Sequence, residues 1–288
     1  MMQDTTPDRF QAADCLKFYE REPTVESPHL KSWYGRGQNF IVDYTLAEPG
    51  ASLERADQSD EYMLILPGRE TRVTIAAGDE TVSVEGYSLT ILPPGRSRID
   101  VEQGGVILRI FTSQADDLAA LCLNRDSYLA PDPNVAPYRP WPEAMDGPRI
   151  RSYSLDVPEE AGRFGRIWRS SNLMVNIFYP QGPRDRKKMT PHHHADFQQG
   201  LLVLEGESIH HLRWPWTSDL DRWQEDEHLK CGAPSLTVIP PPSLHTSQMI
   251  GDNNILVDIF SPPREDFVAK EGWVLNSGDY PPPDTRDP

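Results

Sequence analysis

The sequence predicts an all-β protein built from two barrels of similar shape. Short runs rich in Val, Ile, Leu and Tyr alternate with Gly and Pro, which is typical of antiparallel strands joined by tight turns. The 288 residues include 28 prolines and 19 glycines, which favours short strands and turns over long helices. The same order of strand-like segments also occurs twice, and at so long a period this indicates two copies of one domain.

Each copy is defined by three apolar segments and a closing strand. The first copy has NFIVDYTLAEPG (39–50), EYMLILPGRE (61–70), YSLTILPPGRSR (87–98) and GVILRIFTS (105–113). The second has NLMVNIFYPQG (172–182), QGLLVLEGE (199–207), SLTVIPPPSLH (235–245) and NILVDIFSPP (254–263). We therefore expect an N-terminal barrel within 1–130 and a C-terminal barrel within 151–288.

The connecting region has two parts. The segment DDLAALCLNRD (116–126) predicts one short helix between the barrels, and we expect a further short helix near the N-terminus. Residues 131–150 are rich in proline and predict an extended linker.

Composition restricts the partners and the compartment. A formal charge of −16 argues against nucleic acid and anionic membranes, because both select basic surfaces. The opening residues lack the pattern of a signal peptide, and no apolar run is long enough to span a bilayer. Cys15, Cys122 and Cys231 lie far apart in the sequence without a CxxC motif, which predicts reduced thiols. We expect a cytoplasmic protein.

The stretch TPHHHADFQQG (190–200) predicts a metal site in the second copy. On a strand, alternation places His192 and His194 on one face and His193 on the other. His245 follows at the end of PPPSLH and supplies a third imidazole from a distant strand. Such a three-nitrogen site with open positions suits Fe(II), Mn, Ni, Cu or Zn. The alternative is that the triplet is a solvated loop.

These motifs resemble those of the cupin superfamily. Its first motif is HxH, three or four residues, Glu, six residues and Gly, and here His192 and His194 are followed by Gln199 and Gly206. Its second motif, PxGxxH, is matched by Pro240 to His245 with Pro242 in place of the glycine. The resemblance covers both copies and implies two tandem cupin barrels, the double-stranded β-helix or jelly-roll fold. Cupins serve many reactions, so the resemblance does not choose one.

Other polar residues are candidates to support the ligands. We expect Gln199 near the metal as a hydrogen-bond donor or weak ligand. His193 is expected to point outward, although a register shift would make it a ligand. Gln198, His210 and His211 are candidates for hydrogen bonds behind the ligands rather than for metal binding.

The first copy lacks this ligand set. Counting back seven residues from Glu61 gives Glu54 and Ala56 in place of the two histidines, and Arg98 replaces His245. We expect a metal-free N-terminal barrel in which Glu61 and Arg98 form an ion pair. The alternative is that Arg98 receives an anionic ligand.

Glutamine at position 199 bears on the chemistry. Cupins that keep glutamate there surround the ion with an anion, whereas glutamine leaves a neutral set of ligands. This favours a substrate that brings its own anions to chelate Fe(II), with O2 as co-substrate. The three-histidine site thereby resembles the gentisate, salicylate and hydroxynaphthoate dioxygenases, which cleave aromatic rings. The alternatives are a non-oxidative isomerase or lyase that uses Mn, Ni or Zn, and a non-catalytic ligand-binding cupin.

The substrate side is less defined. Trp214 and Trp216 are candidates to wall an aromatic pocket, or else to pack in the core or a dimer interface. Arg184 and Arg186, in the cationic run RDRKK, are candidates to steer an anionic substrate, or else form a solvated loop. No residue stands out as a catalytic base. Resemblance to cupins with two barrels also implies a homo-oligomer.

Overall fold

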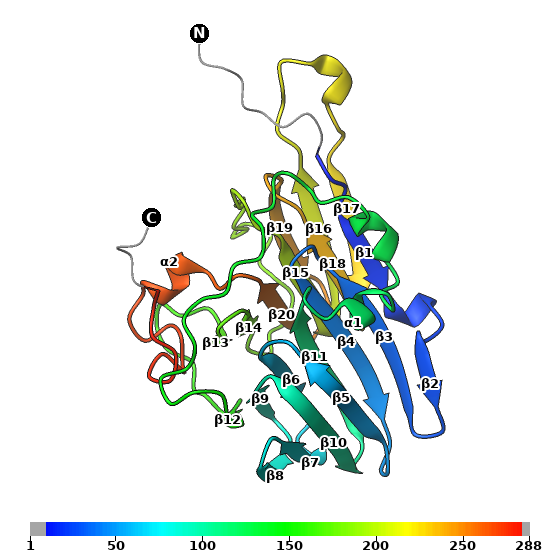
Figure 1. Ribbon diagram of the computed structural model, residues 1–288. Helices are drawn as coiled ribbons and strands as arrows, with labels where there is room; N and C mark the ends of the chain where they lie inside the picture. Colours follow the sequence, from blue (N-terminus) through cyan, green and yellow to red (C-terminus); the bar gives the residue numbers. More distant parts are fainter. Residues whose placement is uncertain (1–9, 284–288) are drawn as a thin grey trace.

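The computed structural model describes residues 10–283, and its regular secondary structure is mainly antiparallel strands (Figure 1). The opening residues, where a signal peptide would begin, lie outside this range. The helices described are short: α1 (Asp116–Ala119), α2 (Glu265–Val268) and the 3₁₀ turns η1 (Phe18–Glu20), η2 (Arg125–Tyr128) and η3 (Leu220–Arg222). The all-β prediction is confirmed, and α1 lies within the segment predicted to be helical.

The N-terminal barrel consists of two sheets. The larger has the strand order β12 (Arg151–Ser154), β9 (Ser88–Leu92), β6 (Tyr62–Leu66), β11 (Gly105–Thr112), β4 (Phe40–Ala47), β3 (Leu30–Arg36) and β2 (Val25–Ser27). The smaller has the order β5 (Ser52–Gln58), β10 (Gly95–Gln103), β7 (Arg72–Ala77) and β8 (Glu80–Glu85).

The C-terminal barrel repeats this plan. Its larger sheet has the order β1 (Asp14–Lys17), β18 (Ser235–Ile239), β15 (Gln199–Glu205), β20 (Ile255–Phe260), β14 (Met174–Ile177) and β13 (Arg166–Arg169). Its smaller sheet has the order β17 (Glu227–Gly232), β16 (Glu207–Arg213) and β19 (Leu244–Met249). Residues 131–150, between the repeats, contain neither helix nor strand.

Each larger sheet is completed by a strand from the other half of the chain. Strand β1 precedes the first barrel in sequence but pairs with β18 of the second, with Cys15 opposite Thr237. Strand β12 follows the linker but pairs with β9 of the first barrel, with Tyr153 opposite Leu89. Two edge strands thus cross the boundaries predicted from the sequence, so the two barrels are interlocked.

The two larger sheets pack against each other and form the central core. This core joins apolar side chains of the first barrel, such as Phe40 and Val42, to Leu202 and Val257 of the second. The interior of the first barrel is one continuous apolar cluster. The interior of the second is divided into two smaller clusters, one around Phe260 and one around Leu201. The polar side chains of the candidate site lie inside this second barrel.

The substitution Gly200→Ala tests the contact between the two larger sheets. A Cβ at this position would lie 2.7 Å from ring atoms of Phe40, so Gly200→Ala must displace either the ring or strand β15. We expect the free energy of unfolding to fall by about 1–3 kcal/mol, the usual cost of overpacking. Denaturant titration would measure it. Gly278→Ala is the control, because its Cβ would meet no atom within 4 Å. An unchanged midpoint for Gly200→Ala would contradict the close packing.

Candidate metal centre

The structure brings the three predicted histidines together. His192 and His194 lie in the irregular segment between β14 and β15, and His245 lies at the start of β19. A single bridge joins His192 to His245, with backbone N···O distances of 3.0 and 2.8 Å in the two directions. One ligand nitrogen from each of the three rings lies within 4.8 Å of the others. Within residues 10–283 no other group of His, Cys, Asp or Glu side chains is placed in this way.

The HxH segment is not a regular strand. Its strand pairing is limited to the isolated bridge between His192 and His245. His192 and His193 are both exposed and His194 is buried, so burial along this segment does not follow the alternation of a strand.

Backbone carbonyl groups set the tautomers of two rings. The Nδ1 atom of His192 lies 3.0 Å from the carbonyl oxygen of Thr190, and Nδ1 of His245 lies 2.9 Å from that of Ser243. A carbonyl oxygen only accepts hydrogen bonds, so both Nδ1 atoms carry the proton. In the neutral rings the Nε2 lone pairs are therefore free to bind a metal.

Gln199 faces the histidines with its amide oxygen. Its Oε1 lies 2.9 Å from Nε2 of His194 and 3.0 Å from Nε2 of His245. Its Nε2 donates to Oδ1 of Asp258 at 2.7 Å, and Oδ2 of Asp258 accepts from Nδ2 of Asn176 at 3.2 Å. Burial raises the pKa of Asp258 to about 6, so at pH 7 the ionised form predominates. An ionised carboxylate needs the donating end of the amide, which directs Oε1 toward the rings.

This donor set fits a cation. Burial lowers the pKa of His194 to about 3 and that of His245 to about 4, so both rings are neutral at pH 7. The Nε2 lone pair of neutral His245 then faces the lone pairs of Gln199 Oε1, and no hydrogen lies between them. A metal ion at this point would turn that repulsion into coordination by nitrogen and oxygen donors.

The other candidate support residues lie at varying distances from this centre. His210 is fully buried on β16, with Nδ1 2.9 Å from Oγ of Ser247, while its Nε2 has no hydrogen-bond partner. His211 points the other way and contacts His228, with 2.8 Å between the two Nδ1 atoms. Gln198 accepts from the backbone N of Gln38, at 2.6 Å, and so ties the site segment to the first barrel.

The four predicted substrate residues differ in burial and in the contacts that they make. Trp214 is buried and donates to Glu227 at 3.1 Å. Trp216 is 77% exposed and stacks on Trp223 in the segment that connects β16 to β17. This segment extends beyond the sheets (Figure 1). Arg184 is half-buried and binds the carbonyl of Ser247 at 2.9 Å, which fastens the loop before the histidines. Arg186 is exposed.

A cavity of about 670 Å³ reaches His193 and His194 from outside the barrel. The aromatic residues that line it are Trp141, from the linker, and Phe197, which stacks on His194 with 4.4 Å between ring centroids. Arg264 also lines it and is paired with Asp266 at 2.7 Å.

Sequence reasoning missed Asp258 and Asn176. A signal was present, because each is a lone polar residue in an apolar strand, in NILVDIF and NLMVNIF. A charged residue in such a run is buried and therefore needs a partner.

Strand pairing corrects the comparison with the first barrel. Both barrels contain the sequence SLT, at residues 88–90 and 235–237. Its threonine lies opposite Leu64 in the first barrel and opposite Leu201 in the second. This register places Tyr62, not Glu61, at the position of Gln199, so the prediction for Glu61 is wrong by one residue. Tyr62 contacts Oγ of Ser97 at 2.7 Å, as Gln199 contacts His245.

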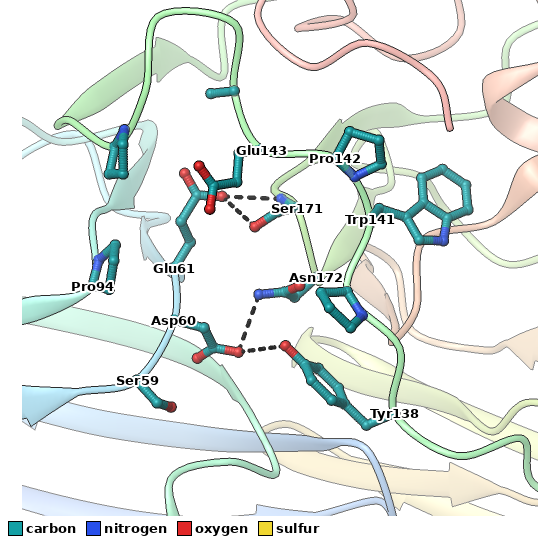
Figure 2. Close-up of a pocket in the computed structure, with 13 residues that line it drawn as sticks. Ser59, Asp60, Glu61, Pro94, Tyr138, Trp141, Pro142, Glu143, Ser171 and Asn172 are labelled. Atoms are coloured by element: carbon teal, nitrogen blue, oxygen red, sulfur yellow. Dashed lines mark hydrogen bonds between the residues drawn. The ribbon is translucent and has the colours of Figure 1, made fainter. Parts of the chain in front are cut away.

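The predicted ion pair between Glu61 and Arg98 is also wrong. Arg98 is exposed and pairs with Glu54 at 2.9 Å. Glu61 instead accepts from Oγ of Ser171 at 2.7 Å and from Oη of Tyr280 at 2.9 Å, beside a pocket between the barrel and the linker (Figure 2). Its carboxylate therefore joins the two halves of the chain.

Known structures share this fold. AerE from Microcystis aeruginosa is 10% identical, with a TM-score of 0.56 over 84% of this chain and 97% of that one. An oxalate decarboxylase from Lactobacillus farciminis is 15% identical, with a TM-score of 0.57 over 87% and 86%. One from Bacillus subtilis, with Mn(II) centres, is 14% identical, with a TM-score of 0.58 over 91% and 80%. These likenesses support the prediction of two tandem cupin barrels.

No protein-family model and no curated protein matches the chain in sequence. Among the described residues, no helix is long and apolar enough to cross a membrane.

Substitution of His245 tests whether the three histidines bind a metal. We expect His245→Ala to lower the affinity for Mn(II) or Zn(II) by more than about 100-fold, since even residues that only support ligands cost 10- to 100-fold. The fold should survive, because the residue lies on a strand already paired with β16. His193→Ala is the control and should bind metal normally. Titration calorimetry with circular dichroism would measure both; full binding by His245→Ala would contradict the assignment.

Proposed function

We propose that the C-terminal barrel is the metal centre of an enzyme that acts on a small chelating carboxylate. The observation that carries this proposal is that Nε2 of His194 and Nε2 of His245 lie 2.9 and 3.0 Å from Oε1 of Gln199. His192 completes the group. A divalent metal held there would supply a Lewis acid that two oxygen atoms of the substrate can chelate.

The charge distribution supports an anionic substrate. Three imidazole nitrogens and an amide oxygen supply no negative charge, so they would leave the double positive charge of a bound ion uncompensated. The carboxylate of Asp258 binds the amide nitrogen of Gln199 and is separated from the histidines by that amide. A site of this charge favours a ligand that brings one or two negative oxygens.

For the reaction, we propose Fe(II)-dependent cleavage of a C–C bond of a hydroxylated aromatic carboxylate, or a chelating diketone, by O2. The neutral donor set supports it, because a chelating dianion then makes the centre electron-rich. His192 is exposed, which leaves one side of the group open to substrate, while His194 and His245 are buried. Trp141 and Phe197 offer aromatic surface near His194.

A second candidate is a non-oxidative reaction on a small organic acid with Mn(II), in which the ion polarises a carbonyl or carboxylate group. The observation that favours it is the shared fold of oxalate decarboxylases, one of which is described with Mn(II) centres. A protein that binds such acids without turnover is the remaining outcome.

Oxygen dependence separates the candidates. We expect protein loaded with Fe(II) to consume one O2 per molecule of gentisate or salicylate, measured with an oxygen electrode and by product chromatography. His245→Ala should show no uptake. Release of CO2 from oxalate under argon by the Mn(II) form would instead support the second candidate. Binding of these acids without any turnover would contradict an enzymatic role.

Exchange of Gln199 and Asp258 tests the charge argument. Gln199→Glu alone would place two carboxylates within about 3 Å, so we expect it to destabilise the metal-free barrel. Combined with Asp258→Asn, it keeps the net charge but moves the carboxylate next to the ion. We expect this double variant to bind Mn(II) at least about tenfold more tightly and salicylate more weakly than the parent.

Titration calorimetry would measure both affinities, with Asp258→Asn alone as the control. That variant should lose metal affinity by about 10–100-fold, because the amide is no longer oriented by an anion. Unchanged affinity for both ligands in the double variant would contradict the charge argument.

A further inference from the structure

Two cysteines that are far apart in sequence meet where β1 joins the C-terminal barrel. Cys15 lies on β1 and Cys231 on β17, and their Sγ atoms are 2.6 Å apart. This is only about 0.6 Å longer than a disulfide bond, and both residues are free thiols. Thr237, opposite Cys15 on β18, has its Oγ1 3.6 Å from Sγ of Cys231.

The two thiols differ in access and in acidity. Cys15 is partly exposed, whereas Cys231 is fully buried. The hydrogen bond from Cys231 lowers the pKa of Cys15 to about 7, and the same contact raises the pKa of Cys231. Cys15 is therefore the thiol that reacts with molecules in solution.

Cys15 opens on a pocket of about 310 Å³ with basic walls. Lys17, Arg21 and Lys230 line it together with Glu20 and His228. Lys17 lies 3.7 Å from Glu20, and Lys230 lies 3.0 Å from Glu207. In a chain of net charge −16, this excess of cations beside a thiol favours a carboxylate-bearing reagent.

We propose that Cys15 and Cys231 form a dithiol that anionic low-molecular-weight disulfides oxidise to an intramolecular disulfide, which ties β1 covalently to the C-terminal barrel. The Cys15 thiolate attacks one sulfur of the reagent, forms a mixed disulfide and releases one thiolate. Cys231 then loses its proton and attacks Sγ of Cys15, which releases the second thiolate. The two cysteines lose two electrons and two protons, and the reagent gains them as two thiols.

The disulfide would link β1 covalently to β17 of the C-terminal barrel. Strand β1 lies at the edge of the larger sheet and is the part of the N-terminal half that pairs with β18. A disulfide from residue 15 to residue 231 closes a very long loop, so the oxidised protein should melt at a higher temperature than the reduced one. The proposal does not depend on the metal centre.

Oxidised and reduced glutathione are suitable probes, applied to the full chain over a range of ratios. After acid quenching and alkylation, we expect non-reducing peptide mapping to show a Cys15–Cys231 link while Cys122 stays alkylated. Cys231→Ser should accumulate glutathione on Cys15. Cys15→Ser should form no adduct, because the remaining two cysteines are buried. Cys122→Ser is the matched control and should form the same link as the parent.

Contrary results are equally clear. A parent protein that keeps three alkylated cysteines at every ratio would overturn the proposal. So would a mixed disulfide on Cys15 that persists in the parent, or an adduct on Cys15→Ser. Circular dichroism checks that the variants fold, and peptide mapping of the parent decides the question if one does not.

Discussion

The hydrogen bond from Gln199 to Asp258 is the interaction on which the candidate centre depends. It forms because β15 and β20 are paired with Leu201 opposite Asp258, so that the carboxylate lies beside the amide two residues earlier. That register is held in turn by the packing of the two larger sheets, where Gly200 allows Phe40 of the other barrel to approach. The amide oxygen is thereby directed at two imidazole nitrogens, and a buried cluster of acceptors results.

The equivalent positions of the first barrel carry a different set of polar side chains. Arg109 and Asp43 occupy the places of Asp258 and Asn176 in the strand pairing, and they form a buried ion pair at 2.6 Å. The hydroxyl groups of Tyr62 and Ser97 form a hydrogen bond with each other, in the place where Gln199 contacts His245 in the second barrel. Both barrels therefore place polar groups inside, but the first barrel neutralises its charge with protein groups. The second leaves the unprotonated Nε2 of His245 facing the amide oxygen of Gln199, which a cation can satisfy.

Local patterns predicted the fold class, the repeat and the three histidines, because spacing and strand periodicity are properties of short segments. They could not predict partners that depend on long-range pairing. The exchange of β1 and β12, the contact of Cys15 with Cys231 and the role of Asp258 all join residues separated by many strands. The error at Glu61 has a simple origin: the sequence pattern equates Glu61 with Gln199, whereas the strand pairing places Tyr62 at that position.

Anomalous diffraction from crystals of protein grown with Fe(II) or Mn(II) is the most direct test of this account. It predicts one strong peak per chain about 2 Å from Nε2 of His192, His194 and His245, with Oε1 of Gln199 as a further ligand and Asp258 still bound to the amide. A peak at another position would contradict the assignment of the centre. A peak among the histidines with Gln199 turned away would contradict the role given to its hydrogen bond.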